Sequence, residues 1–103
     1  MNAPWKAYYP DSALDYDPSA IEAAHLADIP GQAARRYGRE PAVSTQLPSG
    51  ACATLDFSAF DVLSDDLAVY LREVAGLEAG DCVAVMSPNC IGFTLAVFGI
   101  FKA

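Results

Sequence analysis

The stretch "GLEAGDCVAVMSPNCIGFTLAVFGIFKA", residues 76–103, decides the fold class that we expect for this chain. Residues 77–80 read as a short turn, and Asp81 is the turn residue that fixes the start of the next strand. The run at 81–87 is apolar with almost no alternation, which is typical of a parallel strand covered on both faces. The stretch therefore predicts a strand over 81–87 within an α/β fold.

A helix that is apolar around its whole circumference follows this strand. Pro88 ends the strand, and Asn89 is a suitable N-cap for a helix over 90–102, where only Thr94 and Lys102 interrupt the apolar residues. Such a helix belongs inside a larger structure, and the strand before it needs a further parallel strand beside it. We therefore expect an incomplete piece of a larger domain, which in isolation would self-associate. The residues expected in that contact are Ile91, Phe93, Val97, Phe98 and Phe101.

A second helix is predicted over 57–75, with Asp56 as its N-cap and Gly76 as its end. Its apolar residues recur at steps of three and four, opposite a polar face. Asp65 and Asp66 fit that solvated face better than a metal site, because adjacent helical residues do not converge on one ion. The apolar stripe comprises Phe57, Phe60, Leu63, Leu67, Tyr70, Leu71 and Val74.

The region before this helix predicts one more helix and a hairpin. A helix is expected over 25–37, with Pro30 tolerated in its first turn and Gly38 as its stop. Strands at 41–47 and 51–55 flank a Pro-Ser-Gly turn. The predicted order is α-β-β-α-β-α, in an α/β subdomain over 25–103. His25 reads as a solvated or capping residue, since no partner for a general base is apparent.

Residues 1–24 are expected to form an extended N-terminal arm. Prolines in this segment remove backbone donors and favour extended neighbours. Its aromatic residues, Trp5, Tyr8 and Tyr9, either lie on another surface or belong to a partly disordered tail.

Composition excludes several classes of function. The net charge of -7, from 13 acidic and 6 basic side chains, disfavours binding to nucleic acid. Three cysteines without C-x-x-C spacing, and one histidine, cannot form a zinc site. We expect Cys52, Cys82 and Cys90 to be buried, reduced thiols. For Cys90 there is an alternative, because a position at a helix N-terminus can favour the thiolate form. The apolar run at 90–101 is shorter than the roughly 20 residues that cross a bilayer.

Several stretches, taken in order, resemble the N-terminal part of adenylate-forming enzymes, the superfamily of acyl-CoA synthetases, adenylation domains and firefly luciferase. The upstream stretch "HLADIPGQAARRYGREPA" resembles the start of bacterial long-chain fatty acid-CoA ligases, so the resemblance covers residues 5–103. Cys82 departs from the pattern, since a basic residue is common there. The other stretches are "LDFSAF" at 55–60, "LREVAGL" at 71–77, "GDCVAVMSPN" at 80–89 and "FGIFKA" at 98–103.

The first of these stretches resembles the family motif L-T-Y-x-E-L. Leu55, Phe57 and Phe60 match its apolar positions, whereas Asp56 replaces the usual Thr and Ala59 the usual Glu. Asp56 can still cap the helix, but Ala59 cannot reach back to complete a capping box. We expect the cap to be weaker by about 0.5–1 kcal/mol at most.

The resemblance implies a parent enzyme that converts a long-chain fatty acid, ATP and CoA to acyl-CoA, AMP and pyrophosphate. That chemistry needs a Gly/Ser/Thr-rich phosphate loop, an acidic residue for Mg²⁺, an adenine pocket and a mobile C-terminal lysine. We find none of them in this sequence, so we expect no catalytic, cofactor-binding or metal-binding residue here, and no activity from the chain alone. ATP, Mg²⁺ and CoA are implied for the parent enzyme only.

The resemblance also implies partners and a location. The remainder of the parent chain is the expected partner, and the aromatic residues of the arm are candidates for an oligomer contact. The N-terminus lacks the basic and apolar regions of a signal peptide, so we expect a cytoplasmic protein. The parent enzyme could also bind peripherally to the inner face of the membrane. Two alternatives remain: a stand-alone α/β interaction module, and a fragment of an adenylating enzyme for another carboxylic acid.

Overall fold

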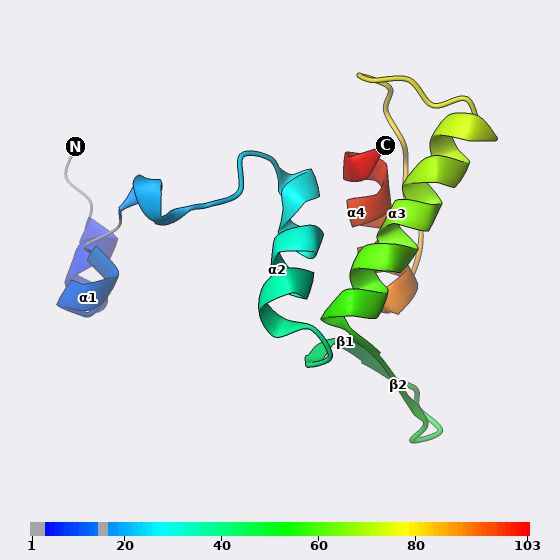
Figure 1. The fold of residues 1–103 in the computed structure, drawn as a ribbon. Coiled ribbons are helices and arrows are strands. Elements are labelled where there is room, and N and C mark those ends of the chain that lie inside the picture. Colours follow the sequence, from blue (N-terminus) through cyan, green and yellow to red (C-terminus); the bar gives the residue numbers. More distant parts are fainter. Residues whose placement is uncertain (1–3, 15–16) are drawn as a thin grey trace.

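The computed structural model describes residues 4–14 and 17–103. Helices α2, α3 and α4 stand side by side, a two-stranded hairpin extends from one end of them, and the N-terminal arm lies apart beyond α2 (Figure 1). The fold is thus mixed helix and strand. In order, the elements are the short 3-10 helix η1 (Pro4–Tyr8), α1 (Asp11–Leu14), η2 (Pro18–Ala20), η3 (Leu26–Asp28), α2 (Ile29–Tyr37), β1 (Pro41–Gln46), β2 (Cys52–Asp56), α3 (Phe57–Glu73) and α4 (Ile91–Lys102).

The helix predicted over 25–37 forms as η3 followed by α2. His25 lies exposed just before η3, where its backbone N–H donates to the Asp28 carboxylate at 3.0 Å. Pro30 lies in the first turn of α2, where a proline loses no helical hydrogen bond, and its side chain is buried. Gly38 ends the helix with a φ of 54°, and its N–H donates to the Ala34 carbonyl. The predicted start and stop of this helix are confirmed.

The predicted hairpin is also confirmed. β1 and β2 pair in antiparallel register, with Val43 opposite Leu55 and Ser44 opposite Thr54. The hydroxyl groups of Ser44 and Thr54 lie 2.8 Å apart across the strands. In the turn, Gly50 has a φ of 87°, a conformation that glycine adopts without strain.

The tightest packing in the molecule is between α3 and α4. Phe60 and Ala68 are the buried apolar residues of α3, and Ser64 between them is fully buried, its hydroxyl donating to the Asp61 carbonyl at 2.8 Å. A Cβ atom on Gly99 of α4 would lie 2.7 Å from Leu67 Cδ2. Small side chains therefore let the two helices approach closely.

The buried face of α3 confirms part of the predicted stripe: Phe60 is buried, and Phe57, Leu67 and Leu71 are partly buried. Leu63, Tyr70 and Val74, which were expected in that stripe, are exposed. Ser64 and Ala68 are buried beside Phe60, and Leu67 lies against Gly99 of α4. The small residues on both helices allow this close packing. Asp56 caps α3 as predicted: its carboxylate accepts a hydrogen bond from the Ala59 N–H at 2.7 Å.

The strand predicted over 81–87 is wrong. The segment has no regular secondary structure, and among the described residues the sheet consists of β1 and β2 alone. A strand satisfies its backbone groups only through a neighbouring strand, and the hairpin does not provide one here. Asp81 does shape the turn before it, since its carboxylate accepts from the Glu78 N–H at 2.9 Å. The order of regular elements from α2 onward is α-β-β-α-α.

The predicted cap of the last helix is also wrong. The N-cap of α4 is Cys90, one residue after Asn89, and it makes no side-chain capping bond. The Ile91 N–H instead donates to Thr45 Oγ1 of β1 at 2.9 Å. A distant hydroxyl thus satisfies a donor at the start of α4.

The N-terminal arm contains short helical turns rather than one extended stretch. η1, α1 and η2 are at most five residues long, and η1 and η2 bury no side chain. Trp5, Tyr8 and Tyr9 are each more than half exposed. The division of the chain at residue 24 into arm and subdomain remains a prediction.

Candidate functional site

Lys102, near the end of α4, lies at the centre of a cluster of charges. Its ammonium group donates to the Asp61 carboxylate at 2.7 Å, to the Asp65 carboxylate at 2.6 Å and to the Asp61 carbonyl at 3.1 Å. Burial alone would lower the pKa of Lys102, but the hydrogen bonds and negative charges of Asp61 and Asp65 outweigh it, so the pKa is raised. Asp65, predicted on a solvated face, therefore takes part in a contact between α3 and α4.

A polar hollow of about 360 Å³ lies over this cluster, where α2, α3 and α4 meet. Arg35 of α2 faces it as well as Lys102, and Asp28 adds a further carboxylate. Because both cations lie among carboxylates, the hollow offers no unopposed charge to a ligand. Its chemistry is that of a structural tie between helices.

A second hollow, of about 320 Å³, lies between β1 and the first turns of α4. Cys90 lies in its wall, half buried, with its Sγ atom 3.6 Å from the Ser87 hydroxyl. A hydrogen bond with Ser87, assisted by the backbone N–H groups of Phe93 and Gly92, holds the pKa of the Cys90 thiol below its ordinary value. The full lining is Val43, Ser44, Thr45, Asn89, Cys90, Ile91, Phe93 and Thr94.

This lining limits the chemistry that Cys90 can perform. Activated cysteine nucleophiles work with a neighbouring base, such as a histidine, that accepts and returns the proton. The side chains around Cys90 are hydroxyl, amide and apolar groups, and none of them is a base near neutral pH. The hollow therefore holds a polarised thiol without the partner that catalysis requires.

The other two cysteines correct a prediction. Cys52 and Cys82 are both exposed, whereas buried thiols were expected. Cys82 lies in the segment without a strand, and Cys52 is the first residue of β2, so no other described element covers either side chain. Within the part of the chain that the structure describes, no group of three or more His, Cys, Asp or Glu side chains is placed to hold a metal ion.

The residues expected to mediate self-association lie on α4 in mixed surroundings. Ile91, Phe93, Val97 and Phe98 are partly buried, and Phe98 packs edge-on against Phe60 with the ring centres 5.7 Å apart. Phe101 is about half exposed. The contact with another copy stays a prediction. No described helix has the length and apolar character needed to cross a membrane.

Comparison with known proteins places these elements in a family. A family model for AMP-binding enzymes matches residues 31–103, which include the hairpin, α3 and α4. Long-chain-fatty-acid–CoA ligases of Yersinia pestis, Escherichia coli O157:H7 and Salmonella typhimurium are each 33% identical to the chain over 104 residues. Each alignment covers 100% of this chain and 17% of the relative, so the chain spans about a sixth of the length of these proteins.

No solved structure shows a significant match to the chain. The family match nevertheless extends over more than half of the sequence, from within α2 to the end of α4. It includes the stretches "LDFSAF" and "GDCVAVMSPN", on which the resemblance to adenylate-forming enzymes was based. The chain belongs to the AMP-binding enzyme family.

Proposed function

We propose that the chain forms the N-terminal part of the large domain of an ATP-dependent acyl-CoA synthetase that acts on long-chain fatty acids. The observation that carries the proposal is the alignment of the whole chain, at 33% identity, with proteins named long-chain-fatty-acid–CoA ligase. The family match over 31–103 supports the adenylate-forming part of it independently.

The proposed reaction has two steps in the complete enzyme. The fatty acid carboxylate displaces pyrophosphate from ATP to give an acyl-adenylate, and the CoA thiol then displaces AMP to give acyl-CoA. Activation is needed because oxide or hydroxide is a poor leaving group from a carboxylate, whereas AMP is a good one. ATP, Mg²⁺ and CoA would be held by residues outside those of this chain.

The role of these 103 residues in that enzyme is architectural. Two features of the chain support this role: Cys90 lacks a base beside it, and the carboxylates of Asp61 and Asp65 are engaged by Lys102. Ser64, Ala68 and Gly99 hold α3 against α4 as a rigid pair.

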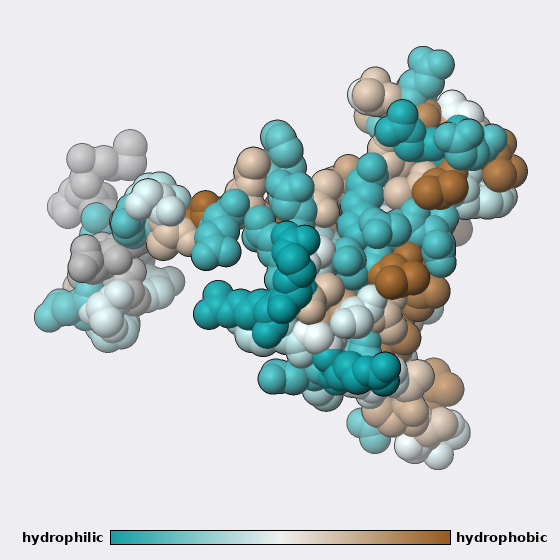
Figure 2. All heavy atoms as spheres, in the orientation of Figure 1, coloured by the Kyte–Doolittle hydropathy of each residue, from teal (hydrophilic) through white to brown (hydrophobic). Residues whose placement is uncertain are grey.

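The exposed apolar surface of the chain supports the presence of further polypeptide against it. Val62 and Val69 of α3, and Val74 directly after it, are each more than half exposed, and Met86 is fully exposed. Figure 2 shows apolar side chains along α3 on the side away from α2. Contiguous apolar surface of this kind is typical of protein contacts.

The proposal is tested by acid-dependent exchange of pyrophosphate into ATP. The protein translated from the uninterrupted reading frame that contains these residues would be assayed with long-chain, short-chain and aromatic acids. We expect exchange with long-chain fatty acids, and formation of the acyl-CoA once CoA is added. Exchange with aromatic or short acids alone would assign the protein to another branch of adenylating enzymes, and no exchange with any acid would overturn the proposal.

The 103-residue chain, assayed alone under the same conditions, separates the architectural role from a catalytic one. We expect no exchange above that of a sample without protein. Exchange by this chain would contradict the architectural role, because a phosphate-binding site would then have to lie within these residues.

A further inference from the structure

The helical unit formed by η3 and α2 lies against α3 and α4 with little buried surface. All residues of α2 are described by the structure, and among them only Pro30 is buried. α3, by contrast, buries Phe60, Ser64 and Ala68. Because buried contacts determine how firmly an element is held, this unit belongs to the least stable part of the folded helices.

Charged groups line the contact between this unit and the other helices. The unit contributes Asp28 and Arg35 to the polar hollow of about 360 Å³. α3 contributes Asp61 and Asp65, α4 contributes Lys102, and the remaining lining residues are uncharged. Three carboxylates therefore face two cations, and loss of Arg35 would leave Lys102 as the single cation among them.

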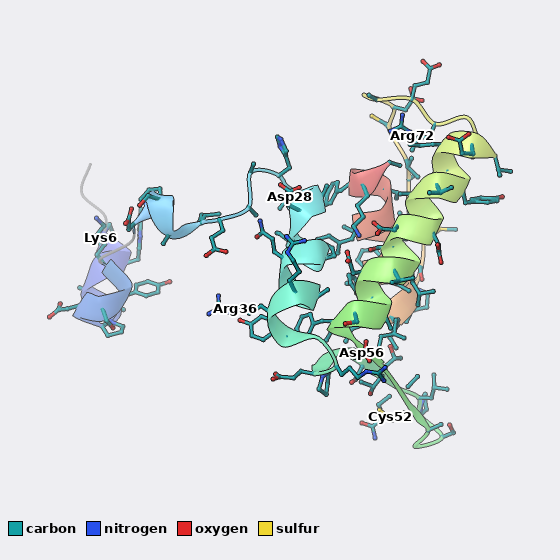
Figure 3. All side chains as sticks on the ribbon, viewed as in Figure 1. Lys6, Asp28, Arg36, Cys52, Asp56 and Arg72 are labelled. Carbon is teal, nitrogen blue, oxygen red and sulfur yellow. The ribbon has the colours of Figure 1, made fainter. Side chains whose placement is uncertain are left out.

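Arg35 is the cation that the unit itself brings to this hollow, and Gly31 gives it room. A Cβ atom on Gly31 would lie 3.6 Å from Arg35 Nη1 and 3.6 Å from Asp61 Oδ1, so the guanidinium and the carboxylate lie close to the same point of α2. Opposite charges at such a separation attract each other even where water is nearby. The neighbouring Arg36 does not line this hollow, and Figure 3 shows it on the side of α2 away from α3. Arg35, rather than Arg36, therefore draws α2 toward α3.

The chain on either side of the unit leaves it free to move about one end. Residues 17–22, which precede it, are exposed. After α2, Gly38 has a φ of 54°, and its carbonyl accepts from the Ser58 N–H at 3.0 Å, so the chain is fixed there at the start of α3. Glycine tolerates a wide range of backbone angles, which makes Gly38 a suitable hinge. Helices shorter than about 12 residues are marginal in water, so α2, with 9 residues, loses helical order once it leaves α3.

We propose that η3 and α2 form a latch that opens from α3 and α4 as one unit, with its hinge at Gly38, and that the charges in the polar hollow hold it closed. Opening takes Asp28 and Arg35 out of the hollow. It also uncovers the ammonium group of Lys102, whose side chain is 10% exposed in the closed structure. This inference concerns the chain by itself and is independent of the proposed acyl-CoA synthetase activity.

Native-state hydrogen exchange tests whether the latch opens by itself. The backbone N–H groups of residues 33–38 report on α2, and those of residues 64–68 report on the buried face of α3. Relative to the rates of unstructured peptides, we expect residues 33–38 to exchange faster than residues 64–68. Equal protection of the two groups would overturn the proposal, because α2 would then open only when the whole molecule unfolds.

Two neighbouring arginines supply matched variants for the role of charge. Arg35→Met and Arg36→Met each remove one positive charge from α2, and arginine and methionine have similar helix propensities. Arg35→Met should raise the exchange of residues 33–38 by about two- to five-fold, the effect expected for loss of an exposed charge contact. Arg36→Met should leave it unchanged, and neither variant should alter residues 64–68. Equal effects of the two variants would mean that the charges in the hollow do not hold the latch closed, and the proposal would be wrong.

Acetylation of lysine gives a second measurement, at the group that the latch covers. Lys6 and Lys102 are the two lysines of the chain, and Lys6 lies in the exposed arm. Modification with an amine-reactive acetyl ester, followed by peptide mass spectrometry, gives the ratio of the Lys102 rate to the Lys6 rate within one sample. This ratio should rise in Arg35→Met and keep its wild-type value in Arg36→Met. The same ratio in all three proteins would show that α2 does not control access to Lys102.

Discussion

Helix α4 and the segment at 81–87 are both strongly apolar in sequence, yet they have opposite surroundings. α4 packs along α3, where Gly99 is buried and Phe98 meets the ring of Phe60. In the other segment, Val83 and Met86 are exposed and the backbone has no regular partner. The comparison shows that an apolar sequence alone does not place a segment in the core.

The difference follows from the backbone. A helix satisfies its own N–H and C=O groups, so α4 needs only one surface to lie on. An extended segment leaves these groups unpaired unless another strand lies beside it, and their burial without partners is costly. Residues 81–87 therefore remain outside the core although their side chains would suit it.

The largest expected effect comes from a substitution in the packing of α3 on α4. Phe60→Ala removes the buried ring that packs edge-on against Phe98. We expect the free energy of unfolding in urea to fall by about 3 kcal/mol or more. Val62→Ala, on the exposed side of the same helix, should change it by less than about 0.5 kcal/mol. Similar losses in both variants would show that the packing of α3 on α4 is not the core of the molecule.

The next effect tests the close approach of the helices. Gly99→Ala places a Cβ atom 2.7 Å from Leu67 Cδ2, so the helices must move apart. We expect a loss of about 1–3 kcal/mol in the free energy of unfolding. Gly92→Ala in the same helix meets only Cys90 Sγ at 3.6 Å, and it should be neutral or stabilising by up to about 1 kcal/mol. A reversed order of the two variants in urea unfolding would contradict the packing described here.

A smaller effect concerns the charges that join the ends of this helix pair. Lys102→Met removes an ammonium group that bonds Asp61 and Asp65, and should lower the free energy of unfolding by about 1–2 kcal/mol at neutral pH. Lys6→Met, in the exposed arm, is the control and should leave it unchanged.

The same pair of variants has a distinct pH dependence. The folded pKa of Lys102 is raised, so its contribution is complete below the unfolded pKa of lysine, about 10.4, and is lost as the pH rises through the folded value. Wild type and Lys6→Met should therefore lose stability in this alkaline range, while Lys102→Met should lose less. Parallel curves for all three proteins would rule out a stabilising role for the Lys102 ammonium.

The smallest expected effect comes from a substitution in the exposed segment at 81–87. Met86→Ser replaces a fully exposed apolar side chain in the segment without a strand. We expect the free energy of unfolding of the chain to change by less than about 0.5 kcal/mol. A loss as large as that of Phe60→Ala in urea unfolding would mean that the segment packs against the core in solution.

Features that depend on neighbouring residues were predictable from the sequence. Gly38 ends α2 through a local φ preference, and Asp56 caps α3 through an N–H three residues away. The absence of a strand at 81–87 and the displacement of the cap from Asn89 depend on distant residues instead. The sequence alone does not reveal which distant group lies nearby.

The charged cluster illustrates the same limit for the candidate site. Asp65 looked like a residue of a solvated face, and Lys102 like an interruption of an apolar helix. Their contact joins positions 37 residues apart, and it exists because Ser64 and Gly99 let α3 and α4 approach closely. The available signal in the sequence was the pair of small residues Ser64 and Ala68, which lie four positions apart and therefore on one face of the helix.

The bond between Thr45 and Ile91 has a consequence for the order of folding. It spans 46 positions, and it satisfies a donor in the first turn of α4 that no neighbouring side chain reaches. Such long-range contacts form late, because the intervening chain must first be closed into a loop. The hairpin can form from local contacts, so we expect it to form before the contact that joins Thr45 to Ile91. α4 would then acquire its fixed starting point from a strand that is already in place.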